Sequence, residues 1–167
     1  MYTLLVMRHA KSDWTTGDAD HGRPLNGRGR RQGLAAAEHL VEYSPIDRVL
    51  CSTSRRTRQT WQRVADGGVA AGEVTFHEEI YESTPADVAP LLQALPDGAR
   101  TVLLVGHFPC VTQLVLELAL HDDHPTWTPV LSKFVTSGIA TLEFRTPWAE
   151  LARHSGRLVD FVAPGRP

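Results

Sequence analysis

The sequence predicts an α/β fold, a three-layer α/β/α sandwich built around a mostly parallel sheet. Short apolar runs of strand length alternate along the chain with longer segments of helical periodicity, which is typical of strands joined by crossover helices. Polar side chains follow several of the apolar runs directly, as they do where sites form beyond the carboxyl ends of parallel strands. A length of 167 residues fits one domain, residues 1–167.

The first half of the chain supplies three of the expected strands. The run 3–7 is apolar throughout, as in a parallel strand that is buried on both faces, and a polar loop over 11–27 follows it. In order, the expected elements are a strand over 3–7, a helix over 28–43 packed through Leu34, Ala37, Leu40 and Val41, a strand over 47–51, a helix over 55–64 with Ser52 or Ser54 as N-cap, and a short edge strand over 74–77.

The second half continues the alternation and then adds two late strands. Thr84 and Pro85 are suited to the N-cap and the first turn of a helix. The expected elements are a helix over 85–95, a strand over 101–106, a helix over 109–120, and strands over 139–144 and 157–162.

Composition argues against several classes of protein. The net charge of −2 does not suit a general nucleic-acid binder. The sequence contains no apolar stretch of 18 residues and begins without a secretory signal, so we expect a cytoplasmic protein with no membrane partner. Two cysteines, Cys51 and Cys110, cannot form a disulfide framework, which agrees with a reducing compartment.

Charge is unevenly distributed along the chain. Residues 1–63 carry eleven basic and six acidic side chains, whereas residues 64–167 carry six and thirteen, and fifteen of the seventeen basic residues are arginine. GC-rich codon usage is one explanation for the excess of arginine. A phosphate site is the other, because the guanidinium group binds phosphate oxygens in a bidentate manner.

Three expected strands end at residues that suit phosphate chemistry. Arg8 and His9 follow the first strand, Ser52 and then Arg56 follow the second, and His107 follows the strand over 101–106. Because the carboxyl ends of neighbouring parallel strands meet at one edge of the sheet, we expect these side chains to share a crevice.

Three arginines crowd the start of the helix over 55–64. The helix macrodipole disfavours cations there, but free N–H groups together with guanidinium groups attract an anion. We expect Arg56 to face the crevice, and Arg55 and Arg58 to point to solvent.

Four motifs resemble the histidine phosphatase superfamily and, within it, the small SixA-type phosphohistidine phosphatases. They are LVMRHAKS over 5–12, RPLN over 23–26 with Gly29, Ser52-x-x-x-Arg56-x-x-Gln59-Thr60, and VGHFP over 105–109. Ala10 replaces the glycine that is usual in the opening motif of the superfamily. The resemblance extends to the late strand around 137–144, and it implies a phosphoglycerate mutase-like fold and phosphatase chemistry without a metal or other cofactor.

The resemblance also implies roles for particular residues. His9 would take up the phosphoryl group, while Arg8, Arg56 and His107 would hold its oxygens and Arg23 would contact phosphate or substrate at the rim. These roles are chemically coherent, because phosphoryl transfer depends mainly on positioning and charge neutralisation. Histidine attacks only when neutral, and nearby guanidinium groups lower its pKa.

The general acid is less well defined by the sequence. Larger members of the superfamily carry a carboxylic acid between the second helix and the last parallel strand. Glu82, which follows Ile80 and Tyr81, occupies the matching place, and Glu79 is the second candidate. A solvated loop would explain both carboxylates equally well.

Other chemistries fit the residues less well. A cysteine phosphatase needs the spacing Cys-x5-Arg, but Thr57 lies six residues after Cys51. The polar segment 121–124, His-Asp-Asp-His, suggests a metal but has no second ligand cluster.

A mutase needs a lid that keeps water out of the site. The loops here are too short to supply much chain for such a lid. A binding module without catalysis would require the loss of His9 or Arg56, and both are present.

The expected substrate is phosphohistidine on a protein, as the resemblance suggests. Imidazole leaves phosphorus easily when its other nitrogen is protonated, whereas an alkoxide needs a proton in the transition state. A chain without an evident acid therefore suits a phosphoramidate. A small phosphorylated metabolite, handled by a phosphomonoesterase or a mutase, remains the alternative.

Overall fold

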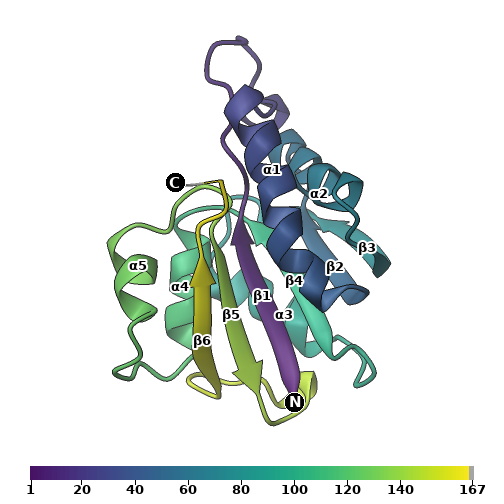
Figure 1. The fold of residues 1–167 in the computed structure, drawn as a ribbon. Coiled ribbons are helices and arrows are strands. Elements are labelled where there is room, and N and C mark those ends of the chain that lie inside the picture. The colour runs from purple at the N-terminus through teal and green to yellow at the C-terminus, as the bar shows by residue number, and fades with distance from the viewer. Residues whose placement is uncertain (166–167) are drawn as a thin grey trace.

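One six-stranded sheet forms the centre of the protein in the computed structural model, which describes residues 1–165 (Figure 1). Residues 166–167, the last two of the expected domain 1–167, lie outside the described residues. The strand order is β3-β2-β4-β1-β5-β6, and only β5 runs against its neighbours. The strands are β1 (Tyr2–Arg8), β2 (Ile46–Ser52), β3 (Ala71–His77), β4 (Thr101–Gly106), β5 (Ile139–Phe144) and β6 (Gly156–Val162).

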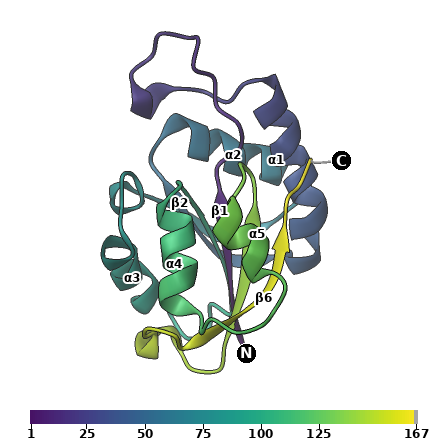
Figure 2. The same cartoon turned by 90° about the vertical axis from the view of Figure 1, so that its left-hand side faces the viewer.

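Helices cover both faces of this sheet, which confirms the predicted α/β class. Helices α1 and α2 lie on one face, while α3 and α4 lie on the other (Figures 1 and 2). The helices are α1 (Gly27–Leu40), α2 (Arg55–Asp66), α3 (Pro85–Gln93), α4 (Cys110–Leu118) and α5 (Trp127–Ser132), with short 3₁₀ turns η1 (Asp20–Gly22), η2 (Val41–Tyr43), η3 (Glu78–Ile80) and η4 (Trp148–Glu150). In the part of the chain that the structure describes, no helix is long and apolar enough to span a bilayer.

The sheet separates two apolar cores because side chains alternate between its faces. In β1, Leu4 and Val6 pack with α3 and α4, whereas Leu5 and Met7 pack with α1 and α2. All four are fully buried, as expected for a central strand with layers on both sides.

Helix starts follow the capping chemistry of the sequence. Ser54, rather than Ser52, caps α2 by accepting a hydrogen bond from the backbone N–H of Thr57. Thr84 and Asp87 form a reciprocal capping box at the start of α3. These caps set the points at which α2 and α3 begin, and so they position the polar residues near the carboxyl edge of the sheet.

The expected packing face of α1 was partly wrong. Leu34 is 41% exposed and Val41 is 45% exposed, whereas Ala37 and Leu40 are buried. Small residues form the buried face instead, because α1 lies very close to α2. A Cβ atom on Gly33 would stand 2.6 Å from Cβ of Arg63, so this contact leaves no room for a larger side chain.

The carboxyl ends of the parallel strands meet at the end of the molecule that carries the 11–25 loop, the part of the polar segment between β1 and α1 that covers residues 11–25. This loop extends beyond the end of β1 (Figure 1). Met7 pairs with Val105 of β4, and Cys51 of β2 pairs with the same residue. The residues that follow β1, β2 and β4 therefore emerge side by side, as the sequence predicted.

Candidate active site

His9 follows β1, and hydrogen bonds hold both its backbone and its imidazole ring in place. Its N–H donates to the carbonyl of Gly106 and its carbonyl accepts from Ser137, each at 3.0 Å. The side chain is buried, and Nδ1 lies 2.7 Å from the carbonyl oxygen of Ala10. Because a carbonyl oxygen only accepts, Nδ1 carries the proton and Nε2 keeps its lone pair.

The surroundings of His9 keep the ring neutral. Burial lowers the pKa of His9 well below its usual range, and the positive charges of Arg56 and Arg8 act in the same direction. The hydrogen bond to Ala10 opposes this shift without cancelling it. At neutral pH the ring is therefore an uncharged base with a free nitrogen.

His107 follows β4 and lies against His9, with 5.3 Å between the ring centroids. Its Nδ1 is 3.4 Å from Nη2 of Arg56, and its Nε2 is 2.8 Å from Oγ of Ser52. Since arginine only donates, Nδ1 accepts and Nε2–H donates to Ser52. Burial, assisted by Arg56, lowers the pKa of His107 to about 3.

Two arginines approach this histidine pair from different elements. Arg56, in the first turn of α2, is buried, while Arg8 at the end of β1 is half-buried and donates to the carbonyl of Phe134. Among the described residues, neither Arg8 Nε nor Arg56 Nε has a hydrogen-bond partner, and both atoms are buried. Unpaired buried donors are costly, so these two positions call for a ligand or water oxygen.

Asp20, in η1, joins three side chains around the site. Its carboxylate lies 3.2 Å from Arg23 and 3.2 Å from Arg56, and it accepts a hydrogen bond from the Tyr81 hydroxyl at 2.5 Å. That hydrogen bond, followed by the charge of Arg56, lowers the pKa of Asp20 to about 2. Asp20 is therefore ionised at any ordinary pH.

Sequence reasoning missed both Asp20 and Tyr81. Asp20 belongs to the 11–25 loop, where no spacing distinguishes it from Asp13 or Asp18. Tyr81 enters the sequence prediction only as the neighbour of Glu82. The one usable signal was its place in that motif, because a tyrosine beside a candidate acid has a hydroxyl for pairing with a carboxylate.

All six predicted site residues line one cavity of about 390 Å³: Arg8, His9, Arg23, Arg56, Glu82 and His107. Arg23 is buried and donates to Ser12 Oγ at 2.8 Å. Glu82 is exposed at the rim, with a backbone φ of 50°. The alternative acid, Glu79, does not line this cavity, and its carboxylate lies 3.8 Å from His77.

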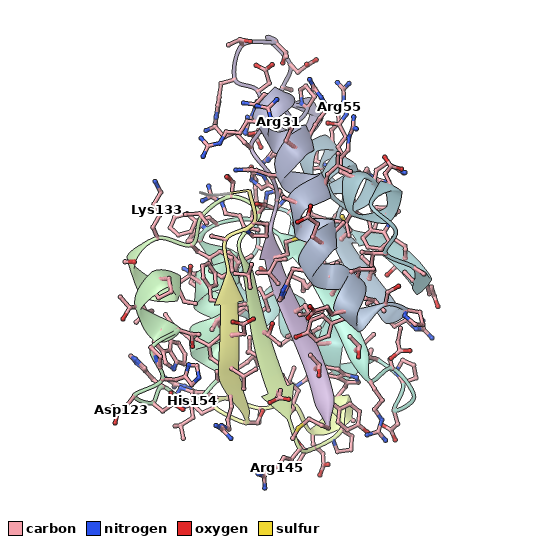
Figure 3. All side chains as sticks on the ribbon, viewed as in Figure 1. Arg31, Arg55, Asp123, Lys133, Arg145 and His154 are labelled. Atoms are coloured by element: carbon pink, nitrogen blue, oxygen red, sulfur yellow. The ribbon has the colours of Figure 1, made fainter. Side chains whose placement is uncertain are left out.

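The remaining sequence candidates lie elsewhere. Arg55 and Arg58 are exposed. Arg55 lies on the surface near the end of the molecule that carries the 11–25 loop (Figure 3). Cys51 is buried, and burial raises the pKa of its thiol to about 12, so it is no thiolate nucleophile.

The polar segment 121–124 has local partners. His124 contacts Thr126, and Asp122 accepts from the indole N–H of Trp127. Within residues 1–165, no three His, Cys, Asp or Glu side chains are grouped so that they could hold a metal ion.

A neutral histidine with a free Nε2, set among arginines at the carboxyl edge of a mostly parallel sheet, defines a site for phosphoryl groups. Comparison with known proteins agrees with this class. The sequence profile of the histidine phosphatase superfamily (branch 1) matches residues 4–88. The chain belongs to this superfamily, which supports phosphatase activity.

Similar proteins match most of the chain. The Mycobacterium tuberculosis protein Rv1276c is 38% identical over 95% of this chain and 99% of its own. Phosphohistidine phosphatase SixA of Escherichia coli is 32% identical over 83% of each chain. The solved structure of a putative phosphohistidine phosphatase SixA from Nakamurella multipartitia superposes with a TM-score of 0.85 at 31% identity, covering 98% of this chain and 96% of that one.

Proposed function

We propose that this phosphatase removes phosphate from phosphohistidine in proteins, without a metal ion, through a phosphorylated His9. The observation that carries the proposal is the neutral His9 ring, whose Nδ1–H is bound to the Ala10 carbonyl and whose Nε2 is free, in a cavity lined by Arg8, Arg56 and His107. The names of the SixA relatives support the choice of substrate.

In the first step, the Nε2 lone pair of His9 attacks phosphorus in line with the bond to the substrate nitrogen. The new P–Nε2 bond forms as the substrate P–N bond breaks, and that electron pair goes to the leaving imidazole. The leaving ring departs neutral because its other nitrogen is already protonated. The Ala10 carbonyl, 2.7 Å from Nδ1, stabilises the positive charge that develops on the His9 ring.

In the second step, a water oxygen bonds to phosphorus and the P–Nε2 electron pair returns to His9. Both water protons stay with the product, dihydrogen phosphate, which then ionises in solvent. In both steps the guanidinium groups of Arg8 and Arg56 neutralise charge on the equatorial oxygens. Their buried, unpaired Nε–H groups are donors that phosphoryl oxygens would satisfy.

The carboxylates near the site favour a substrate that needs little acid catalysis. Asp20 is held ionised by Tyr81, Arg56 and Arg23, so it has no proton to give. Glu82 lines the cavity but is exposed to water. An alkoxide leaving group would depend on Glu82 as the acid, whereas the imidazole of phosphohistidine would not.

The test compares a phosphohistidine peptide with a phosphoserine peptide and a sugar phosphate. We expect turnover of the phosphohistidine peptide to be lost in His9→Ala, unchanged by EDTA, and reduced about 10²–10³-fold in Arg56→Ala, as for removal of one preorganised donor. The control variant Glu82→Gln should change this turnover by less than about threefold.

Two results would contradict the proposal. Loss of activity on metal stripping would refute the metal-free mechanism. Rapid hydrolysis of phosphoserine or a sugar phosphate that collapses in Glu82→Gln would make the protein a phosphomonoesterase for small substrates, although the role of His9 would stand.

A further inference from the structure

Two large aromatic side chains stand exposed at the active-site cavity. Trp14, from the loop after β1, is 71% exposed, and Phe108, directly after His107, is 53% exposed. Both line the same cavity as His9. Most of the other large exposed hydrophobic side chains are aliphatic residues scattered over the surface, which is ordinary. Two exposed aromatic rings that line one cavity point to a binding role.

Each ring is held in place by an arginine of the same cavity. The guanidinium carbon of Arg23 lies 3.5 Å from the centroid of the Trp14 ring, and that of Arg8 lies 5.2 Å from the centroid of Phe108. Such cation–π contacts occupy one face of a ring. The large exposed fractions show that much of each ring remains open to solvent.

The geometry of phosphoryl transfer decides what meets these rings. His9 is only 7% exposed, whereas both aromatic rings are more than half exposed, so the nucleophile lies deeper in the cavity than the rings. An in-line displacement places the leaving atom on the side of phosphorus opposite the nucleophile. The leaving group therefore points outward, toward the exposed side of the cavity where Trp14 and Phe108 lie.

We propose that Trp14 and Phe108 form an aromatic rim that contacts the leaving group and selects a flat aromatic ring over an aliphatic alcohol. Aromatic side chains attract other rings in stacked or edge-on arrangements beyond simple burial of area. The proposal deepens the proposed function, on which it rests, because the leaving group of phosphohistidine is an imidazole ring.

The experiment measures kcat/KM for two P–N substrates, a phosphohistidine peptide and the phosphoramidate ion. The peptide presents an imidazole ring at the leaving nitrogen, whereas phosphoramidate releases ammonia and presents neither a ring nor a peptide. Trp14→Ala and Phe108→Ala should each lower kcat/KM for the peptide about 3- to 10-fold, the size of one aromatic pair. Both should leave phosphoramidate turnover within about twofold. Trp14→Phe, which keeps an aromatic ring, should retain most of the wild-type kcat/KM for the peptide.

Phe76→Ala is the matched control. Phe76 is also exposed and also stacks on an arginine, Arg58, at 4.0 Å, but it does not line the cavity. Its removal should leave kcat/KM unchanged for both substrates. A thermal melt of each variant confirms that the fold is retained.

An equal loss on both substrates would overturn the proposal, because the rings would then act only through Arg8 and Arg23. Unchanged turnover of the peptide in both alanine variants would overturn it as well. Failure of the proposed function gives a different result: the wild-type protein would hydrolyse phosphoserine or phosphoramidate but not the phosphohistidine peptide.

Discussion

At the scale of single residues, one carboxylate offsets part of the positive charge of the active-site cavity. Arg8, Arg23 and Arg56 bring three positive charges to its lining, and the ionised carboxylate of Asp20 pairs with two of them. This pairing positions Arg23 and Arg56 before any substrate arrives. Preorganised charges are more effective in catalysis because they need not reorganise during the reaction.

Asp20 should make stability depend on acid pH. Its pKa is about 2 in the folded protein and 3.8 in an ordinary carboxyl group, so the folded state favours the ionised form. The stabilisation is fully present above about pH 4 and is lost as the pH falls toward 2. In urea denaturation, Asp20→Asn should be less stable than wild type at pH 6, and the difference should shrink at pH 2. A constant difference across this range would refute the pairing.

The two site histidines should stay neutral where ordinary histidines become charged. The pKa of His9 lies well below 6.5, and that of His107 is about 3. Their ¹⁵N ring shifts should therefore not move between pH 8 and pH 5. Because the unfolded chain takes up these protons near pH 6.5 and the folded chain does not, the two groups reduce stability progressively below that pH. Titration of His9 near pH 6.5 would contradict this environment.

Residues at strand ends were predictable, and loop-to-loop contacts were not. His9 and His107 each follow a strand, and Arg56 lies in the first turn of the helix after β2, so the parallel sheet alone brings them together. Asp20 meets Tyr81 across a sequence separation of 61 residues. That contact depends on how two irregular segments fold over the sheet edge, and no local pattern encodes it.

At the scale of elements, helix α1 packs closely through small residues and not through large apolar side chains. Its buried face contains glycine and alanine, and its first turn lies against the segment that follows His9. A Cβ on Gly29 would lie 2.0 Å from the carbonyl oxygen of Lys11. The periodicity of larger residues pointed to Leu34 and Val41, because small residues contribute little to an apolar pattern even where they make the closest contacts.

Substituting this glycine should disturb both stability and catalysis. Gly29→Ala forces α1 away from the backbone at Lys11, which cannot yield as a flexible side chain would. We expect unfolding free energy to fall by about 1–3 kcal/mol, as for other overpacked sites, and kcat to fall because His9 is two residues from Lys11. Gly98→Ala is the control, since nothing lies within 4 Å of the added atom. Equal free energies of unfolding for the two variants in urea denaturation would contradict the close contact between Gly29 and Lys11.

At the scale of the whole molecule, the order of strands explains why so few residues suffice for a site. The sheet places β4 between β1 and β2, so segments distant in sequence end side by side. The alternation of patterns predicted this layered class. It did not predict α5, because six residues that include a proline and two polar side chains, Trp127–Ser132, carry no clear helical period.

A bound oxyanion should stabilise the entire protein, because it would join the ends of β1 and β4 to the start of α2. A ligand at 100 times its Kd adds about 2.7 kcal/mol to the free energy of unfolding. For a chain of this size that corresponds to a rise in Tm of about 5–10 °C. We expect inorganic phosphate to produce this rise in a thermal melt at constant ionic strength, with chloride as the reference anion.

Arg56→Ala should remove most of this shift, since it deletes a buried guanidinium that lines the cavity. Arg145→Ala is the matched control, because Arg145 is an exposed arginine at the opposite end of the molecule from the 11–25 loop (Figure 3). It removes the same charge from the protein, so its shift should equal that of the wild type. If phosphate raised Tm equally in both variants, the anion would be binding by general charge attraction, and the cavity around His9 would not be its site.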